Sequence, residues 1–153
     1  MRSRLIRAVS VLAVFASVVP LVAQDQAADE LRKLQGVWTV TAAEQRGRPF
    51  DVIKGGVLTI GDRSFALKTA AGNEFKGEIR IHQATTPRQL DFVHANNGPV
   101  WEAIYSVTDD VFRLNYVEAG GQDKRPTLFA TSADTPGTVI VMRRVANMTP
   151  APQ

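Results

Sequence analysis

From Gly36 onward, apolar and polar residues alternate at every second position, in short runs separated by turn residues. Successive side chains of a β-strand point to opposite faces, so this alternation is typical of half-buried strands. Turn signals such as Gly61-Asp62 and residues 96–99 (Asn-Asn-Gly-Pro) stand between the runs. Short strands at regular spacing, each joined to the next by a turn, indicate an all-β barrel or sandwich.

The alternation predicts eight or nine strands, each joined to the next by a short connection. Consecutive hairpins favour an up-and-down antiparallel barrel of 8–9 strands, while a β-sandwich remains the alternative because the same alternation serves it. The predicted strands are residues 38–42, 58–60, 65–67, 75–82, 90–92, 100–107, 111–117, 127–131 and 138–145. Residues 45–49 are predicted to form a polar loop.

One short helix is predicted at residues 27–35, before the first strand. Asp29 and Glu30 lie in its first turn and Arg32 and Lys33 in its last, as the helix dipole favours, and Gly36 ends it. Two leucines three residues apart share one face of this helix, which could therefore cover one end of the barrel.

The first 23 residues have the composition of a secretory signal peptide. Three arginines precede an apolar stretch at residues 8–19, and residues 21–23 offer a small-residue cleavage site. An uncleaved membrane anchor is the alternative, but Pro20 and the polar residues after the apolar stretch disfavour it. The predicted organisation is a signal peptide at residues 1–23, one barrel domain at 24–146 and a flexible tail at 147–153, with the mature protein periplasmic or secreted.

Removal of the signal changes the charge of the chain. Three of the 18 Lys and Arg residues lie in it, which leaves 15 basic against 15 acidic residues in a mature chain of 130. This balance gives no support for a nucleic-acid groove or for binding to an anionic membrane. The chain has no cysteine, so neither a lipid anchor on cysteine nor a disulfide is available. The core alone must stabilise the fold.

Gly36 and Trp38 open the first strand as a Gly-x-Trp pair that resembles the lipocalin signature. In lipocalins this tryptophan closes the barrel floor and an arginine from the final strand covers it. The resemblance therefore implies that Arg143 or Arg144 lies over Trp38 as a cation–π partner.

Further motifs resemble a largely uncharacterised family of exported bacterial proteins with a lipocalin-like domain. They span nearly the whole mature chain in the order of the family, and they imply a fold but no reaction or ligand. The motifs are Leu34-Gln35-Gly36-x-Trp38-x-Val40, Gly61-Asp62 with Phe65-x-Leu67, Lys76-Gly77, Leu90-Asp91-Phe92, Ile104-Tyr105-x-Val107, Asp110-x-Phe112-Arg113-Leu114 and Arg125-Pro126-Thr127-x-Phe129-Ala130-Thr131.

Seven aromatic residues are predicted to face the barrel interior: Trp38, Phe65, Phe92, Tyr105, Phe112, Tyr116 and Phe129. A barrel of about eight strands is either filled by side chains or holds one small ligand. A cavity would need small inward residues, and Ala42, Ala103 and Gly77 supply only a few. The first functional hypothesis is a non-enzymatic protein that binds a small apolar or amphipathic molecule in the barrel, above Trp38, with the wall and mouth formed by Phe92, Tyr105, Phe112, Tyr116 and His94.

A protein-interaction module with a packed barrel is the second hypothesis. Small exported barrels that open with Gly-x-Trp include inhibitors of secreted proteases, which insert an N-terminal arm into the enzyme. Here the arm at residues 24–29 is short and acidic, and the disulfide usual in those inhibitors cannot form. An interior cavity of at least ~300 Å³ would favour ligand binding, whereas a filled barrel would favour surface interaction.

The remaining polar residues predict neither a metal site, nor another cofactor, nor an enzyme. His82 shares a strand face with charged residues and is predicted to face solvent, while His94 follows Phe92 at a spacing of two and should point inward. No histidine pair or carboxylate cluster has metal-ligand spacing. Asp109-Asp110 is predicted to be a turn, and the chain has no nucleophile elbow or phosphate-binding loop.

Overall fold

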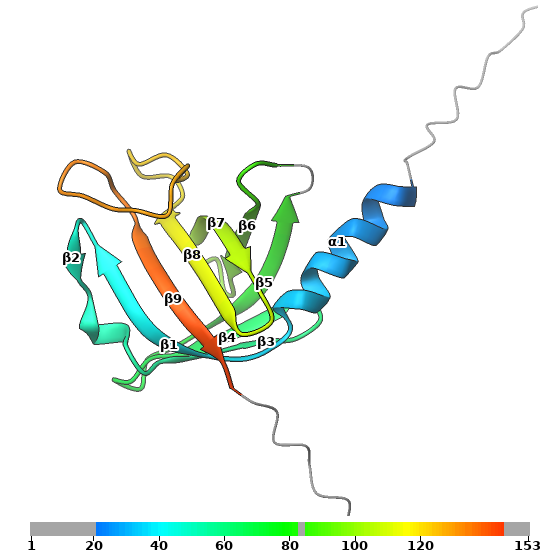
Figure 1. The fold of residues 1–153 in the computed structure, drawn as a ribbon, viewed down its shortest axis with the longest axis horizontal. Helices are drawn as coiled ribbons and strands as arrows, with labels where there is room; N and C mark the ends of the chain where they lie inside the picture. Colours follow the sequence, from blue (N-terminus) through cyan, green and yellow to red (C-terminus); the bar gives the residue numbers. More distant parts are fainter. Residues whose placement is uncertain (1–20, 83–84, 146–153) are drawn as a thin grey trace, which may run out of the picture.

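The computed structural model describes residues 21–82 and 85–145, which form a closed antiparallel barrel with one helix beside it (Figure 1). The predicted signal peptide up to residue 20 and the predicted tail lie outside the described residues. The elements are α1 (Leu21–Leu34), β1 (Gly36–Gln45), β2 (Arg48–Pro49), the 3₁₀ turn η1 (Asp51–Ile53), β3 (Val57–Ile60), β4 (Ser64–Lys68), β5 (Glu74–His82), β6 (Gln89–His94), β7 (Val100–Val107), β8 (Val111–Glu118) and β9 (Thr138–Arg144).

The sheet closes because β1 pairs on both of its edges. Residues 36–39 of β1 pair with β3, and residues 38–45 pair with β9. From β3 to β9 each strand pairs with the next in chain order, so eight strands form an up-and-down barrel. The short β2 is an additional strand on the end of β1. The predicted lipocalin-like all-β barrel is therefore confirmed, and the sandwich alternative is excluded.

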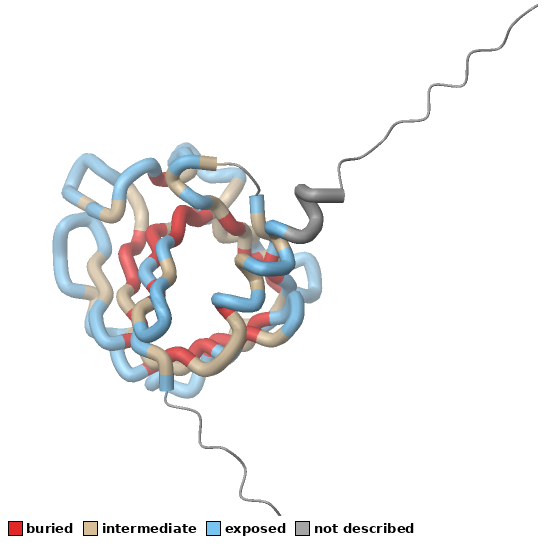
Figure 2. Tube along the Cα trace, turned by 45° about the vertical axis from the view of Figure 1, so that its right-hand side comes forward, coloured by how far each residue is buried: buried red, intermediate tan, exposed pale blue. Residues whose placement is uncertain are grey.

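The barrel interior is filled by apolar side chains from all eight barrel strands. β6 shows the pattern clearly, because buried and half-buried residues alternate along its whole length. Figure 2 shows the strands as a closed ring with buried positions recurring along them. The core comprises Leu34, Trp38, Val40, Leu58, Ile60, Phe65, Leu67, Ile79, Leu90, Phe92, Ala103, Tyr105, Phe112, Leu114, Ile140 and Met142.

A β-bulge in β1 corrects two details of the sequence prediction. The pairing of β1 with β9 shifts register between Val40 and Ala42, so the alternation that begins at Trp38 does not continue. Ala43 packs against the core instead, while Ala42, which was expected to face inward, is exposed. Beyond the bulge β1 runs on to Gln45 and pairs with β2, so the predicted loop at residues 45–49 is partly strand.

The segment at residues 127–131 is not the predicted strand but part of the long loop between β8 and β9. Those two strands pair directly with each other, which leaves no position for a strand between them. The backbone carbonyls of Leu128 and Phe129 instead accept hydrogen bonds from the side chains of Asn115 and Arg113, at 2.8 and 2.7 Å. Phe129 therefore lies outside the barrel, where the guanidinium carbon of Arg113 is 5.2 Å from the Phe129 ring centroid. The predicted inward orientation of Phe129 is wrong.

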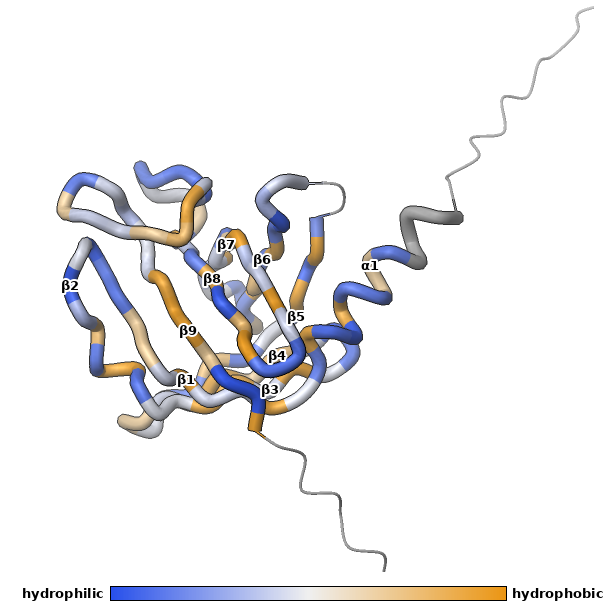
Figure 3. Tube along the Cα trace, in the orientation of Figure 1, coloured by the Kyte–Doolittle hydropathy of each residue, from blue (hydrophilic) through white to orange (hydrophobic). Residues whose placement is uncertain are grey.

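Helix α1 begins earlier than predicted, at Leu21, and ends at Leu34, so it extends across the predicted cleavage position after residue 23. Its last turn joins the barrel, because Leu34 is fully buried and Leu31 packs against the core. The N-terminal half of α1 projects away from the strands (Figure 1), and hydrophilic residues lie along much of the helix (Figure 3). Within the described residues, no helix combines the length and apolar character needed to span a bilayer.

Candidate functional site

The barrel floor is formed by Trp38, whose side chain is completely buried at the start of β1. Its indole N–H donates a 2.8 Å hydrogen bond to the carbonyl of Leu34, and its ring packs on Phe112 at 5.5 Å. The guanidinium carbon of Arg144 lies 4.0 Å from the Trp38 ring centroid. Of the two arginines considered from the sequence, Arg144 is thus the cation–π partner, and Arg143 is exposed.

Arg144 also joins the floor to the end of α1. Its Nη1 and Nη2 donate hydrogen bonds to the carbonyls of Gln35 and Lys33, at 2.6 and 2.8 Å, and its Nε donates to Asp109 O at 2.6 Å. The last carbonyls of a helix lack partners within the helix and favour a cation. Gly36 makes room for this contact, since a Cβ there would lie 2.8 Å from Arg144 Nη1 and the residue has φ +124°.

The centre of the barrel leaves little space for a ligand. The apolar cavity between Val40, Leu58, Phe65 and Met142 measures about 20 Å³. This is close to the volume of one water molecule and far below the roughly 300 Å³ at which small-molecule pockets begin. The described side chains therefore fill the barrel, which is the first of the two states that its size allows.

The five predicted ligand-binding residues do not surround one pocket. Phe112 packs on Trp38 at the floor, and the Tyr105 hydroxyl points outward to α1. Phe92 and His94 are buried nearer the opposite end, the mouth, and Tyr116 is half-buried there.

Two aromatic residues that the sequence analysis did not include, Phe75 and Trp101, complete an aromatic cluster at the mouth. Trp101 stacks on Tyr116 at 4.7 Å and contacts His94 at 4.1 Å, between ring centroids. Phe75 lies 5.7 Å from His94. The alternation of β5 and β7 would have placed both residues inward.

Gly77 explains how the mouth cluster packs so closely. It pairs with Phe65 on one side and with His94 on the other. Because glycine has no side chain, the Phe65 and His94 rings meet across it at 5.3 Å. A Cβ at this position would collide with the carbonyl of Val93.

His94 is buried in this cluster, and its Nε2 has no hydrogen-bond partner among the described residues. Burial lowers the pKa of the imidazole below its ordinary value, against the opposing effect of the Glu118 carboxylate. A neutral ring is therefore favoured in the folded protein, because apolar surroundings penalise the charged form.

The lowered pKa predicts that the protein loses stability in mild acid. The unfolded chain takes up a proton near the ordinary histidine pKa of about 6.5, while the folded chain does so only at lower pH. The free energy of unfolding should hence fall as pH drops from about 7.5 through 6.5. Urea denaturation at pH 7.5 and 5.5 should show a smaller pH dependence for His94→Phe than for the wild type. An equal dependence in both proteins would refute the assignment to His94.

A groove of about 350 Å³ lies between α1 and the ends of β5 and β7, on the outside of the barrel floor. Glu30 of α1 is its central polar residue. One carboxylate oxygen accepts a hydrogen bond from Lys33 Nζ at 2.7 Å, and the other accepts from Arg88 Nη1 at 2.8 Å and from the Tyr105 hydroxyl at 3.2 Å. These contacts attach the middle of α1 to the barrel.

The ionisation of Glu30 and Tyr105 follows from these contacts. Burial acts to raise the pKa of Glu30, but the hydrogen bond from Lys33 and the charge of Arg88 outweigh it, and the pKa lies below its ordinary value. Burial and then the Glu30 charge raise the pKa of Tyr105 well above its ordinary value. Glu30 is thus an anion and Tyr105 a neutral donor near pH 7.

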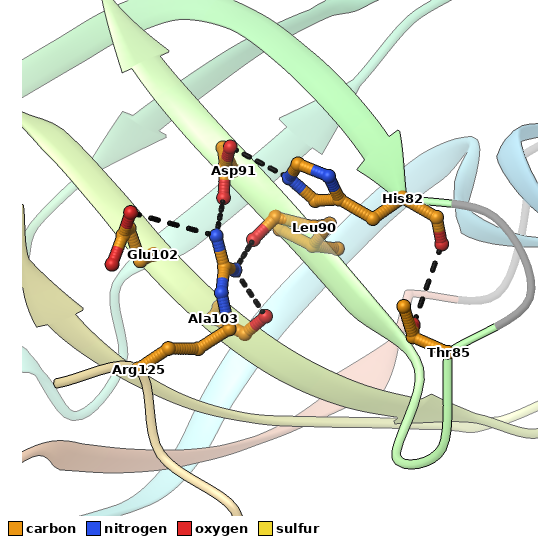
Figure 4. Close-up of polar contacts among 7 residues, drawn as sticks. All are labelled: His82, Thr85, Leu90, Asp91, Glu102, Ala103 and Arg125. Atoms are coloured by element: carbon orange, nitrogen blue, oxygen red, sulfur yellow. Dashed lines mark hydrogen bonds and ion pairs between the residues drawn. The ribbon is translucent and has the colours of Figure 1, made fainter.

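His82 lines the same groove and belongs to a polar network on the outer face of β6 and β7 (Figure 4). As predicted, it faces solvent. Its Nε2 lies 2.7 Å from Asp91 Oδ2, and Asp91 Oδ1 accepts a 2.6 Å bond from Arg125 Nη2. Arg125 Nη1 donates to the carbonyls of Leu90 and Ala103. Arg125 thereby fastens the β8–β9 loop to the barrel, and Asp91 fixes the His82 ring.

This groove was not predicted from the sequence, although it contains Tyr105. The contact between His82 and Asp91 could have been found from the sequence. Alternation places both residues on the outer face, and their two strands follow each other as a hairpin. The contacts of Glu30 with Arg88 and Tyr105 join residues 58 and 75 positions apart. No local pattern encodes such contacts.

The described residues contain no group of three or more His, Cys, Asp and Glu side chains arranged to hold a metal ion. A scan against models of known protein families found no match to this chain, and a search of curated proteins found no similar protein.

Proposed function

We propose that this protein is an exported, non-enzymatic binding protein of the lipocalin-like family, and that it takes a small amphipathic molecule in the groove beside α1. The observation that carries the proposal is the convergence of Glu30, Arg88 and Tyr105 in a groove of about 350 Å³, whereas the barrel interior offers about 20 Å³. The adjoining cleft is larger, about 540 Å³, and its polar lining consists of Arg63 and Arg80. The groove falls within the size range of small-molecule sites. The proposal keeps the ligand class that the sequence suggests but moves the site out of the barrel.

The composition of the groove supports an amphipathic ligand. Ala27 and Ile81 supply apolar surface, while Glu30, Arg88 and Tyr105 converge as polar groups. Titratable groups with shifted pKa values in a cleft are typical of functional sites. Export rests on the sequence pattern of the signal peptide.

A binding role fits the polar groups better than catalysis does. The His82–Asp91 pair has the form of an oriented general base. However, Asp91 is also bonded to Arg125, and the neighbouring Thr85 hydroxyl is directed to the His82 backbone carbonyl at 3.5 Å rather than to its ring. No nucleophile is thereby presented to this imidazole among the described residues.

Protein interaction remains the second candidate, and the packed barrel favours it. The projecting part of α1 would then be the contact surface. The specific comparison with protease inhibitors loses support, because residues 24–29, the supposed inserting arm, belong to the helix α1.

Fluorescence titration with N-phenyl-1-naphthylamine, a neutral apolar probe, tests the groove. We expect saturable binding to the purified protein with one site per chain, and Ala27→Trp should weaken it about tenfold because the indole fills the groove. Ala28→Trp is the matched control, since Ala28 lines the adjoining cleft with Arg63 and Arg80 but not the groove, whereas Ala27 lines both. This control should bind the probe as the wild type does.

Two results would contradict the proposal. Equal binding by Ala27→Trp and the wild type would place the probe elsewhere. The absence of saturable binding would leave the protein-interaction alternative.

A further inference from the structure

The two cations of the groove, Lys33 and Arg88, use only part of their hydrogen-bond donors on its carboxylates. Lys33 and Arg88 each donate to Glu30 through one nitrogen. A lysine ammonium has three N–H groups and an arginine guanidinium has five. Several donors on these two side chains therefore remain for another acceptor.

The charged side chains that line the groove are balanced, with the carboxylates of Asp29 and Glu30 and the cations Lys33 and Arg88. Glu30 is bonded to both cations, and Asp29 is bonded to Arg32, which is not part of the lining. The remaining titratable residues that line the groove are His82, bonded to Asp91, and Tyr105, which is kept neutral by its raised pKa. The cations that a ligand would meet in the groove are thus Lys33 and Arg88.

Within the cluster formed by Glu30, Lys33 and Arg88, the two cations are the accessible part. The side chains of Lys33 and Arg88 are 54% and 50% exposed, whereas Glu30 is 20% exposed. Glu30 therefore lies beneath and holds the two cations apart from each other, one on each carboxylate oxygen. This arrangement presents two cationic side chains to the groove above Glu30. The other carboxylate of the lining, Asp29, is exposed and is bonded to Arg32.

We propose that the groove selects a ligand with a carboxylate head group, held by Arg88 and Lys33, whose short apolar chain lies on Ala27 and Ile81. Carboxylates match the planar guanidinium of arginine through paired N–H donors, and such charge-assisted bonds are stronger than neutral ones. The inference rests on the proposed function and names the ligand class of the same site.

Competition against N-phenyl-1-naphthylamine tests the head-group preference. Decanoate, decan-1-ol and decyltrimethylammonium share one apolar chain and differ in the charge of the head. Decanoate should displace the probe at a concentration about fivefold or more below that of decan-1-ol, as expected for partly exposed charged hydrogen bonds. The cationic decyltrimethylammonium should be the weakest competitor, and added salt should reduce the advantage of decanoate.

In Arg88→Gln, decan-1-ol and decanoate should displace the probe at nearly the same concentration, so that the ratio of these two concentrations is close to one. The ratio is the readout because a change in the shape of the groove affects both competitors together. Arg80→Gln is the control, since this exposed cation of β5 lines the adjoining cleft and not the groove. It should leave the ratio unchanged.

The outcomes distinguish failure of the carboxylate preference from failure of the proposed function. If the probe binds, is lost in Ala27→Trp and is displaced equally by all three competitors, the groove stands and the carboxylate preference is wrong. A ratio that is unchanged in Arg88→Gln also overturns the preference. If the probe does not bind at all, the proposed function itself fails.

Discussion

Replacing Trp38 with alanine is expected to lower the free energy of unfolding by about 3–5 kcal/mol. The indole is completely buried and contacts Phe112 and the guanidinium of Arg144. Its removal opens a cavity at the floor where α1 and β9 meet, and the carbonyl of Leu34 loses its donor. The cost combines lost apolar burial with the cavity left behind.

Urea denaturation followed by circular dichroism measures the effect of Trp38→Ala. Trp38→Phe is the matched variant, because it keeps an aromatic ring under Arg144 and removes the indole N–H. It should cost about 1–3 kcal/mol, the range for leaving a buried acceptor without its partner. A loss below about 1 kcal/mol in Trp38→Ala would mean that Trp38 does not close the barrel.

Arg144→Ala is expected to give the second large effect, lowering the free energy of unfolding by about 2–3 kcal/mol. The change removes one cation–π contact and leaves the carbonyls of Lys33, Gln35 and Asp109 without their donor. Hydrogen bonds from a charged group contribute about 1.5–3 kcal/mol each, and partial access of water to these carbonyls reduces their sum.

Arg143→Ala provides a control one residue away. Arg143 is exposed, and exposed substitutions usually change stability by no more than about 0.5 kcal/mol. Arg144→Lys should recover part of the loss, since it keeps the charge but not the three-way hydrogen bonding. Equal effects of Arg143→Ala and Arg144→Ala in chemical denaturation would be inconsistent with the observed floor.

The floor was accessible to sequence reasoning because it depends on short patterns. Gly36 and Trp38 are two residues apart, and Arg144 continues the inward alternation of Ile140 and Met142 in β9. The same alternation could have chosen Arg144 over Arg143. The barrel itself follows from period-two runs and hairpin turns, which are local properties of the chain.

The errors arose where long-range packing overrides a local pattern. Residues 127–131 alternate as a strand would, but β8 already pairs with β9, so this segment covers the outer surface. Ala42 follows the inward pattern until the bulge after Val40 shifts it. Whether the barrel is hollow depends on how all its side chains fit together, and composition alone does not determine that.

The groove beside α1 could not be predicted from local patterns either, because it depends on long-range packing. Tyr105 was selected as an inward aromatic residue, and its ring is indeed in the core, yet its hydroxyl reaches Glu30 at the surface. That contact requires α1 to lie against the end of β7. The helix could be predicted from its charges and its glycine stop, but the direction in which it leaves the barrel could not.

The location of a bound probe tests the central claim, that this packed barrel binds ligands beside α1 rather than inside. In two-dimensional ¹H–¹⁵N spectra recorded during titration with N-phenyl-1-naphthylamine, the largest shifts should fall on Ala27, Lys33 and Ile81, which line the groove. Changes concentrated instead on Leu58, Phe92 and Leu114, which surround the interior cavity, would contradict the claim.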